Sequence, residues 1–131
     1  MSDNREEQVL PQVEELFTRL GIDTARDITI GGLKASLVAY GYVKAVVVLL
    51  HIGKTDSSVS FSSVAEAITL RSHAADALDR QTVAVLLTTE RVPDAVRAAL
   101  REWAVTVIQL TEDDAWLRRL RQELREFAVV V

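Results

Sequence analysis

The stretch that decides the fold of this chain is Val43–Lys54, which reads VKAVVVLLHIGK. Its middle is an unbroken apolar run rich in valine, so a strand built from it is apolar on both faces. Strands of that kind lie in the centre of sheets that are covered on both sides. The polar run that follows, residues 53–58, predicts a loop. We therefore expect a buried central strand over residues 43–52, with Lys54 at its carboxyl end.

The residues before this strand predict a helix and two antiparallel strands. Apolar residues at three- and four-residue spacing indicate a helix over Glu6–Leu20, and Pro11 places the start of its regular part near Leu10. The short strand Asp27–Ile30 and the alternating stretch Leu33–Tyr40 follow, with two glycines as the turn between them.

Helices alternate with strands in the rest of the chain. Ser63 and Glu66 have the spacing of a capping box, which predicts that a helix begins there and that Glu66 caps Ser63. A further helix is expected to begin at Pro93, and Thr111 is expected to cap the final one. The two strands between these helices are predicted over residues 83–89 and 105–110.

This order, α-β-β-β-α-β-α-β-α, predicts an α/β fold with a mixed central sheet flanked by helices. We expect a single domain over residues 1–131, with residues 1–5 flexible and residues 128–131 forming an apolar tail. Trp103 is expected beneath the sheet, and Trp116 is expected inside as well. The core strand residues are predicted to be Val46, Val48, Leu50, Val83, Val85 and Leu87.

Composition and charge narrow the functional classes. The chain is 49% hydrophobic and 26% charged, has no cysteine and two histidines, and carries a formal net charge of −4. Disulfides and thiolate metal sites are therefore excluded. The acidic balance disfavours a protein that binds phosphate backbones over much of its surface, so a nucleic-acid site would be a local patch. The lack of a long apolar run and of a signal peptide predicts a cytoplasmic protein without membrane contact.

The chain resembles the restriction-endonuclease-like proteins of the PD-(D/E)XK superfamily, and among them the Mrr-like branch. The resemblance covers residues 6–120. It is carried by the leading helix, the hairpin at Gly31-Gly32-Leu33, the strand before Lys54 and the valine-rich strand that ends in Thr88-Thr89. It implies a fold of this order and a magnesium-dependent nuclease site. That site needs an acidic residue on the second strand, and an acid or glutamine two residues before the lysine.

The metal ligands that the resemblance implies are missing from the sequence. Residues 32–36 read GLKAS, without an acid, and Ile52 stands two residues before Lys54. Lys54 alone matches the motif. We therefore expect no nuclease activity, no metal and no other cofactor. We interpret the chain as a catalytically inactive module, a pseudo-nuclease, that binds nucleic acid or a partner protein.

Two alternatives remain open. One is a working metal-dependent nuclease whose ligands have moved, with Asp27, Glu66 and Lys54 as the catalytic set and Mg²⁺ as the cofactor. A minor one is a STAS-like regulatory protein, suggested by the polar loop Asp56-Ser57-Ser58 and the later alternation of strands and helices.

The expected binding residues lie where parallel strands end, because functional groups meet at that edge of such sheets. The residues predicted there are Lys54, Thr88, Thr89 and Arg91. The expected partner is a second copy of the chain, since restriction-endonuclease-like proteins often work as dimers and an exposed apolar tail would be an aggregation hazard. The contact is predicted to involve the tail or the last-helix residues Trp116, Leu117, Leu120 and Leu124.

Overall fold

The computed structural model describes residues 2–54, 56–127 and 129, with the backbone alone for residues 2–4. Its elements follow the predicted order. They are α1 (Ser2–Arg19), β1 (Asp23–Ile30), β2 (Leu33–Tyr40), β3 (Lys44–His51), α2 (Phe61–Leu78), β4 (Gln81–Thr88), α3 (Asp94–Arg101), β5 (Val105–Gln109) and α4 (Ala115–Glu126). Residues 2–5, expected to be flexible, belong to α1, and most of the predicted tail lies outside the described residues.

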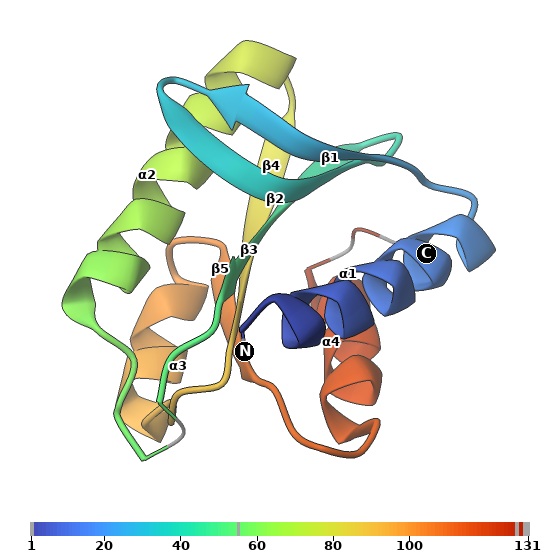
Figure 1. The fold of residues 1–131 in the computed structure, drawn as a ribbon. Helices are drawn as coiled ribbons and strands as arrows, with labels where there is room; N and C mark the ends of the chain where they lie inside the picture. Colours follow the sequence, from blue (N-terminus) through green and yellow to red (C-terminus); the bar gives the residue numbers. More distant parts are fainter. Residues whose placement is uncertain (1, 55, 128, 130–131) are drawn as a thin grey trace.

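The five strands form one mixed sheet in the order β1-β2-β3-β4-β5. The first three strands pair antiparallel, while β3, β4 and β5 run parallel to one another. Helices α1 and α4 cover one face of the twisted sheet, and α2 and α3 cover the other (Figure 1). The predicted fold class, a mixed sheet flanked by helices, is therefore confirmed.

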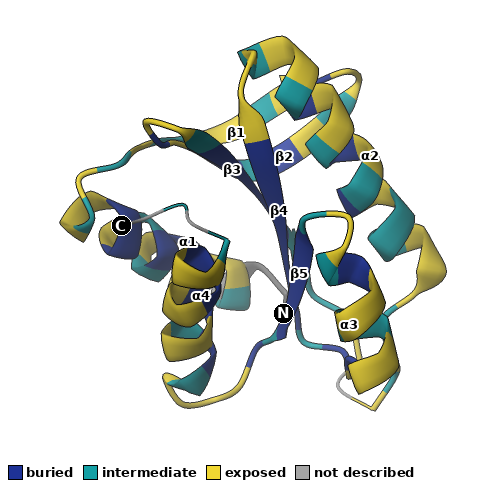
Figure 2. Cartoon of the chain, turned by 180° about the vertical axis from the view of Figure 1, so that it is seen from behind, coloured by how far each residue is buried: buried dark blue, intermediate teal, exposed yellow. Residues whose placement is uncertain are grey.

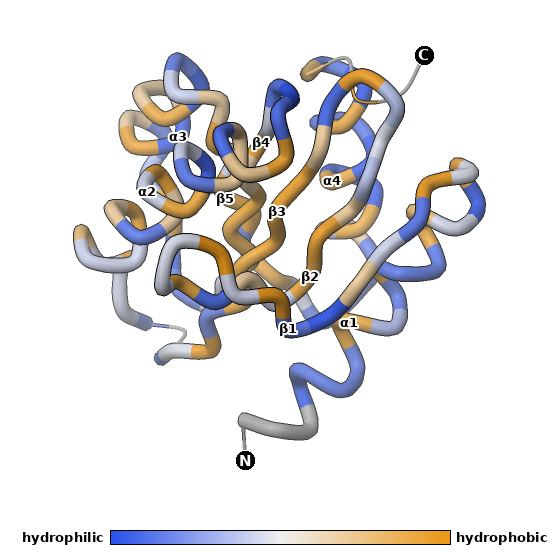
Figure 3. Tube along the Cα trace, turned by 90° about the horizontal axis from the view of Figure 1, so that it is seen from above, coloured by the Kyte–Doolittle hydropathy of each residue, from blue (hydrophilic) through white to orange (hydrophobic). Residues whose placement is uncertain are grey.

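Two apolar layers hold the helices to the sheet, one on each face. The layer under α1 and α4 contains Phe17, Val48, Val85, Trp116 and Leu120, all buried. The other layer packs Ala67 and Leu70 of α2 and Leu100 of α3 against the opposite face of the same strands. Figure 2 shows the buried strands between helices whose outer sides are exposed, and Figure 3 shows the apolar strands enclosed by more polar helices. The unbroken apolar runs of β3 and β4 reflect this two-sided burial.

The predicted core is confirmed in the strands but not at Trp103. The strand residues are buried, except that Leu50 is only partly covered. Trp116 is 3% exposed, whereas Trp103 is 57% exposed. Helix α3 ends at Arg101, two residues before Trp103, and the chain turns through Ala104, which has a positive φ of 57°. Trp103 therefore lies in the turn beyond the helix, and its helical spacing from Leu100 does not apply.

Several predicted boundaries were wrong for local reasons. Pro11 lies inside α1, where it and Glu7 are exposed, so water can reach the carbonyl that proline leaves without an amide partner. Helix α4 begins at Ala115 instead of at Thr111, because the Asp113 carboxylate accepts the Ala115 amide at 3.0 Å. Acidic side chains accept hydrogen bonds at helix starts as readily as threonine does.

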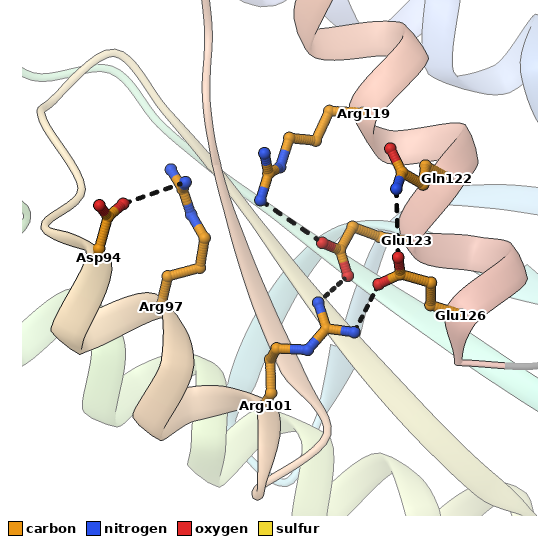
Figure 4. Close-up of polar contacts among 7 residues, drawn as sticks. All are labelled: Asp94, Arg97, Arg101, Arg119, Gln122, Glu123 and Glu126. Atoms are coloured by element: carbon orange, nitrogen blue, oxygen red, sulfur yellow. Dashed lines mark hydrogen bonds and ion pairs between the residues drawn. The ribbon is translucent and has the colours of Figure 1, made fainter.

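Ion pairs connect α3 to α4 around the β5 edge of the sheet. The Arg101 guanidinium donates to Glu123 and to Glu126, each at 2.6 Å. Arg119 lies 3.8 Å from Glu123, and Gln122 donates to Glu126 (Figure 4). Of the arginines on the last helix, Arg119 thus belongs to a salt-bridge network with buried Glu123 at its centre.

Candidate functional site at the carboxyl edge of the sheet

The central parallel strands end side by side, and the loops after them are joined by backbone hydrogen bonds. His51 of β3 pairs in register with Thr88 of β4. Beyond them, the Arg91 amide donates to the Ser57 carbonyl and the Val59 amide donates to the Arg91 carbonyl, both at 2.8 Å. The two loops therefore form one connected surface at this edge, the place where the sequence predicted a site.

The two threonines predicted as binding residues form hydrogen bonds with the backbone of these loops. The Thr89 hydroxyl accepts the Gly53 amide at 2.8 Å and lies 2.7 Å from the Gly53 carbonyl, to which it donates. The Thr88 side chain is fully buried, and its hydroxyl accepts the Glu90 amide at 3.1 Å. Thr88 and Thr89 therefore shape the edge of the sheet from inside. Arg91 is exposed and its guanidinium donates to the Asp56 carbonyl at 2.9 Å.

A histidine and a buried glutamate form the most unusual pair at this edge. The Nε2 atom of His51 lies 3.1 Å from Oε1 of Glu90, whose side chain is only 10% exposed. The backbone of Gly53 presses against the same carboxylate, since a Cβ at Gly53 would lie 2.7 Å from its Cδ atom. The contact does not have hydrogen-bond geometry, since Oε1 of Glu90 is buried and has no hydrogen-bond partner among the described residues. The sequence did not indicate Glu90, although it follows the strand end at Thr88.

A small pocket lies beside this pair, and it includes part of the stretch in which the resemblance places an acidic residue. Its volume is about 140 Å³. It is lined by Lys34, Ser36, Leu49, Leu50, His51, Ser63, Glu66 and Leu86. Lys34 also lies 3.4 Å from Asp27, and the Leu50 amide donates to the Ser36 hydroxyl at 3.2 Å. The pocket therefore gathers side chains from β2, β3 and α2 at the end of the sheet.

Glu66 does not have the capping role that its spacing predicted. Helix α2 begins at Phe61, and Ser60 is its cap, with the Ser60 hydroxyl accepting the Ser63 amide at 3.1 Å. Glu66 lies a full turn further along the helix and lines the pocket. The capping-box interpretation was wrong because Ser60, three residues before Ser63, matches the cap position better.

The side chains at this edge do not fit a magnesium ion. Ile52 is turned toward the apolar layer under α1 and α4, away from the pocket. Lys34 lines the pocket from the stretch in which the motif needs an acid, and a cation there opposes a metal ion. Across the part of the chain that the structure describes, no three histidine, aspartate or glutamate side chains gather closely enough to hold a metal. The alternative catalytic set is not brought together in this pocket. Glu66 lines it, and Asp27 contacts the pocket residue Lys34. Lys54 is exposed and does not line the pocket.

Two solved structures are similar to this chain in fold. AF1548, a protein of unknown function, superposes with a TM-score of 0.63 at 9% sequence identity, over 90% of this chain and 76% of that one. A repair endonuclease from Pyrococcus abyssi superposes with a TM-score of 0.56 at 11% identity, over 82% of this chain. The match covers 47% of the endonuclease, so the chain spans about half of its length.

These likenesses agree with the element order and confirm the restriction-endonuclease-like α/β fold. No protein-family model and no curated protein matches the sequence. No helix among residues 2–54 and 56–127 is both long and apolar enough to span a bilayer.

Proposed function

We propose that the chain is a non-catalytic binding or assembly module built on a restriction-endonuclease-like fold, a pseudo-nuclease of Mrr-like ancestry. The observation that carries this proposal is the identity of the side chains at the carboxyl-edge pocket. Lys34 and Ser36 line it from the strand that should supply an acid. A lysine and a serine can contact a phosphate or a carboxylate of a partner, but they cannot hold Mg²⁺. The pocket is therefore suited to recognition.

The ligand of this module is nucleic acid or a partner protein, recognised through the exposed cations of the carboxyl edge. Lys34, Lys54 and Arg91 are exposed there on a chain of net charge −4, and Lys34 also pairs with Asp27 at 3.4 Å. Such cations support binding of limited extent, because each neutralised phosphate adds to affinity. The module acts as a homodimer in this proposal.

Metal-dependent nuclease activity is the second candidate, because Glu66 and His51 line the same pocket. Metal ligands in nucleases are mainly carboxylates, and this pocket has one carboxylate beside a lysine. A single carboxylate next to a lysine is too few ligands for a metal ion, which favours the binding module.

A cleavage assay separates the two candidates. Purified full-length chain is incubated with labelled single- and double-stranded DNA and with Mg²⁺ or Mn²⁺, and we expect the DNA to stay intact. Fluorescence anisotropy on the same DNA then measures binding, with Lys34→Gln and Lys54→Gln compared against Arg118→Gln, which removes a charge on α4. Cleavage that needs the metal and disappears in Glu66→Gln or in Lys54→Ala would overturn the proposal in favour of the nuclease.

A further inference from the structure

A larger cavity lies at the opposite edge of the sheet, where β3 and β4 begin. Its volume is about 510 Å³. One side of it is the start of β3 and β4, where Lys44 pairs with Gln81. There the first residues of β4 have no partner in β5, because β5 begins opposite Ala84. Side chains from the end of α2 and Phe127, which follows α4, complete it. We call it the amino-edge cavity; it is remote from the carboxyl-edge pocket because the strands run the length of the sheet between them.

Three cationic side chains and one carboxylate line the amino-edge cavity. The cations are Lys44, Arg71 and Arg80, and the carboxylate is Asp79. The hydrogen bonds of these cations go to neutral backbone carbonyls: Lys44 to Phe127 and Arg80 to Gly41, both at 2.5 Å, and Arg71 to Thr82 at 3.5 Å. Among the described residues, none of the ion pairs includes Lys44, Arg71 or Arg80. The cavity therefore carries an excess of positive charge.

Arg71 is the least well hydrogen-bonded of the three cations. Its Nε atom is buried and has no hydrogen-bond partner in the structure. A buried donor without an acceptor costs free energy, and in native proteins such groups are paired with protein, water or a bound ion. The hydrogen bond that this guanidinium makes, from a terminal nitrogen to the Thr82 carbonyl at 3.5 Å, is at the limit of hydrogen-bond length. An incoming oxyanion can accept from the terminal nitrogens of this guanidinium, since Arg71 lines the cavity while its Nε atom is covered by protein.

We infer that the amino-edge cavity binds a phosphate monoester, with the phosphate held by Arg71, Arg80 and Lys44. Arginine forks bind phosphate oxygens in pairs, and a lysine ammonium adds a point charge. A cavity of this volume is in the range of small-molecule sites, about 300 to 1,000 Å³, so it has room for an organic group beside the phosphate. Ala75, Val83 and Phe127 provide apolar surface for that group. The chemistry is that of a nucleotide, either free or at the phosphorylated end of a nucleic-acid strand.

Isothermal titration calorimetry on the full chain tests this site with three probes: inorganic phosphate, adenosine monophosphate, and a short single-stranded oligonucleotide with a 5′-phosphate. We expect saturable binding of the monophosphate that weakens as salt is added, since screening reduces charge attraction. Arg71→Gln should weaken it by about tenfold or more, in line with the loss of a hydrogen bond between charged groups. Arg80→Gln, at an exposed position, should weaken it several-fold. Tighter binding of the oligonucleotide than of the nucleotide would assign the phosphate to a strand end.

Arg118→Gln is the matched control, because it removes the same charge from α4 outside the cavity. It should bind the probes as the wild type does. Equal weakening in Arg118→Gln and Arg80→Gln would mean a general charge effect and would overturn the site, as would the absence of saturable heat with all three probes at millimolar concentration. Thermal unfolding of each variant confirms that it is folded, and Arg80→Gln keeps the test decisive if Arg71→Gln does not fold. The proposed function at the carboxyl edge stands or fails separately, because it rests on different residues.

Discussion

The close approach of Gly53 to Glu90 shows how single residues set the carboxyl edge. The Glu90 side chain occupies the space that a Cβ at Gly53 would need, and its carboxylate lies beside His51. Because the φ of Gly53 is not in the left-handed region, the glycine is needed for space and not for backbone freedom.

Gly53→Ala should destabilise the protein by about 1 to 2 kcal/mol, because the new methyl group forces the Glu90 side chain away. Chemical denaturation measures this loss. In a Glu90→Ala background the same substitution should cost much less, since the clashing atoms are gone. An equal cost in both backgrounds would show that the contact is not the cause.

At this scale the sequence revealed the residues of the motif more readily than the side chains that line the pocket. Lys54, Ile52 and the acid-free stretch at residues 32–36 could be identified from a motif that is local in sequence. The position of Glu90 beside His51 and that of Lys34 in the pocket could not, because they depend on which strands end together and on which way a side chain turns. The buried glutamate sits after a strand in a segment that reads as an ordinary loop, and the sequence carries no pattern for its pairing with His51.

At the scale of elements, α3 and α4 are joined by the ion pairs that Arg101 makes with Glu123 and Glu126. The Glu123 side chain is 4% exposed and pairs with Arg101 at 2.6 Å, whereas Arg119 lies further away at 3.8 Å.

Helix boundaries were the weakest predictions because several residues compete for each cap. Trp103 and Glu66 were both misassigned by helical spacing that began or ended one turn from the true boundary.

Arg101→Met should lower the free energy of unfolding by about 2 kcal/mol at neutral pH. Removing one partner of a buried ion pair costs about 3 to 5 kcal/mol, and the 37% exposure of the Arg101 side chain reduces that cost. Arg97→Met is the matched control, since Arg97 contacts the fully exposed Asp94 at 3.7 Å, and we expect less than about 0.5 kcal/mol there. Urea unfolding of both variants makes the comparison. Similar losses in the two would contradict a special role for the network.

The same network makes the stability of the folded protein depend on pH. Hydrogen bonds from Arg101 and then from Gln122 lower the pKa of Glu126 below its ordinary value of 4.5. A lowered pKa in the folded state means stability that is present above about pH 4.5 and is lost as the pH falls through the folded-state pKa. Glu126→Gln should therefore show a smaller fall in melting temperature than the wild type between pH 6 and about pH 3. A fall equal to that of the wild type would contradict this assignment.

At the scale of the whole molecule, the two-sided burial of β3 and β4 is what the sequence determined best. Continuous apolar runs, the order of elements and the length of the chain sufficed for the sheet and its covering helices. Contacts between copies of the chain were not accessible in this way. The last-helix residues that were expected to face a partner, Trp116, Leu120 and Leu124, lie instead in the layer against α1, where each is at most 3% exposed.

We still predict a homodimer, with the tail contributing to the contact as the sequence suggested, although Val129 is partly buried against the layer under α1 and α4. Light scattering on the full chain should give about twice the chain mass of 14.5 kDa. Deleting residues 128–131 should shift the mass toward that of one chain. A full-length protein that stays monomeric at high micromolar concentration would rule the dimer out.

The central claim is that the carboxyl-edge pocket recognises a ligand without a metal ion. Calorimetric titration of Mn²⁺ into the full chain tests it most directly, since Mn²⁺ binds oxygen ligands in the manner of Mg²⁺. With Lys34 lining the pocket and Glu66 as its one carboxylate, we predict no saturable heat. A saturable heat that is abolished in Glu66→Gln, and kept in the matched variant Glu102→Gln on the exposed surface, would contradict the claim.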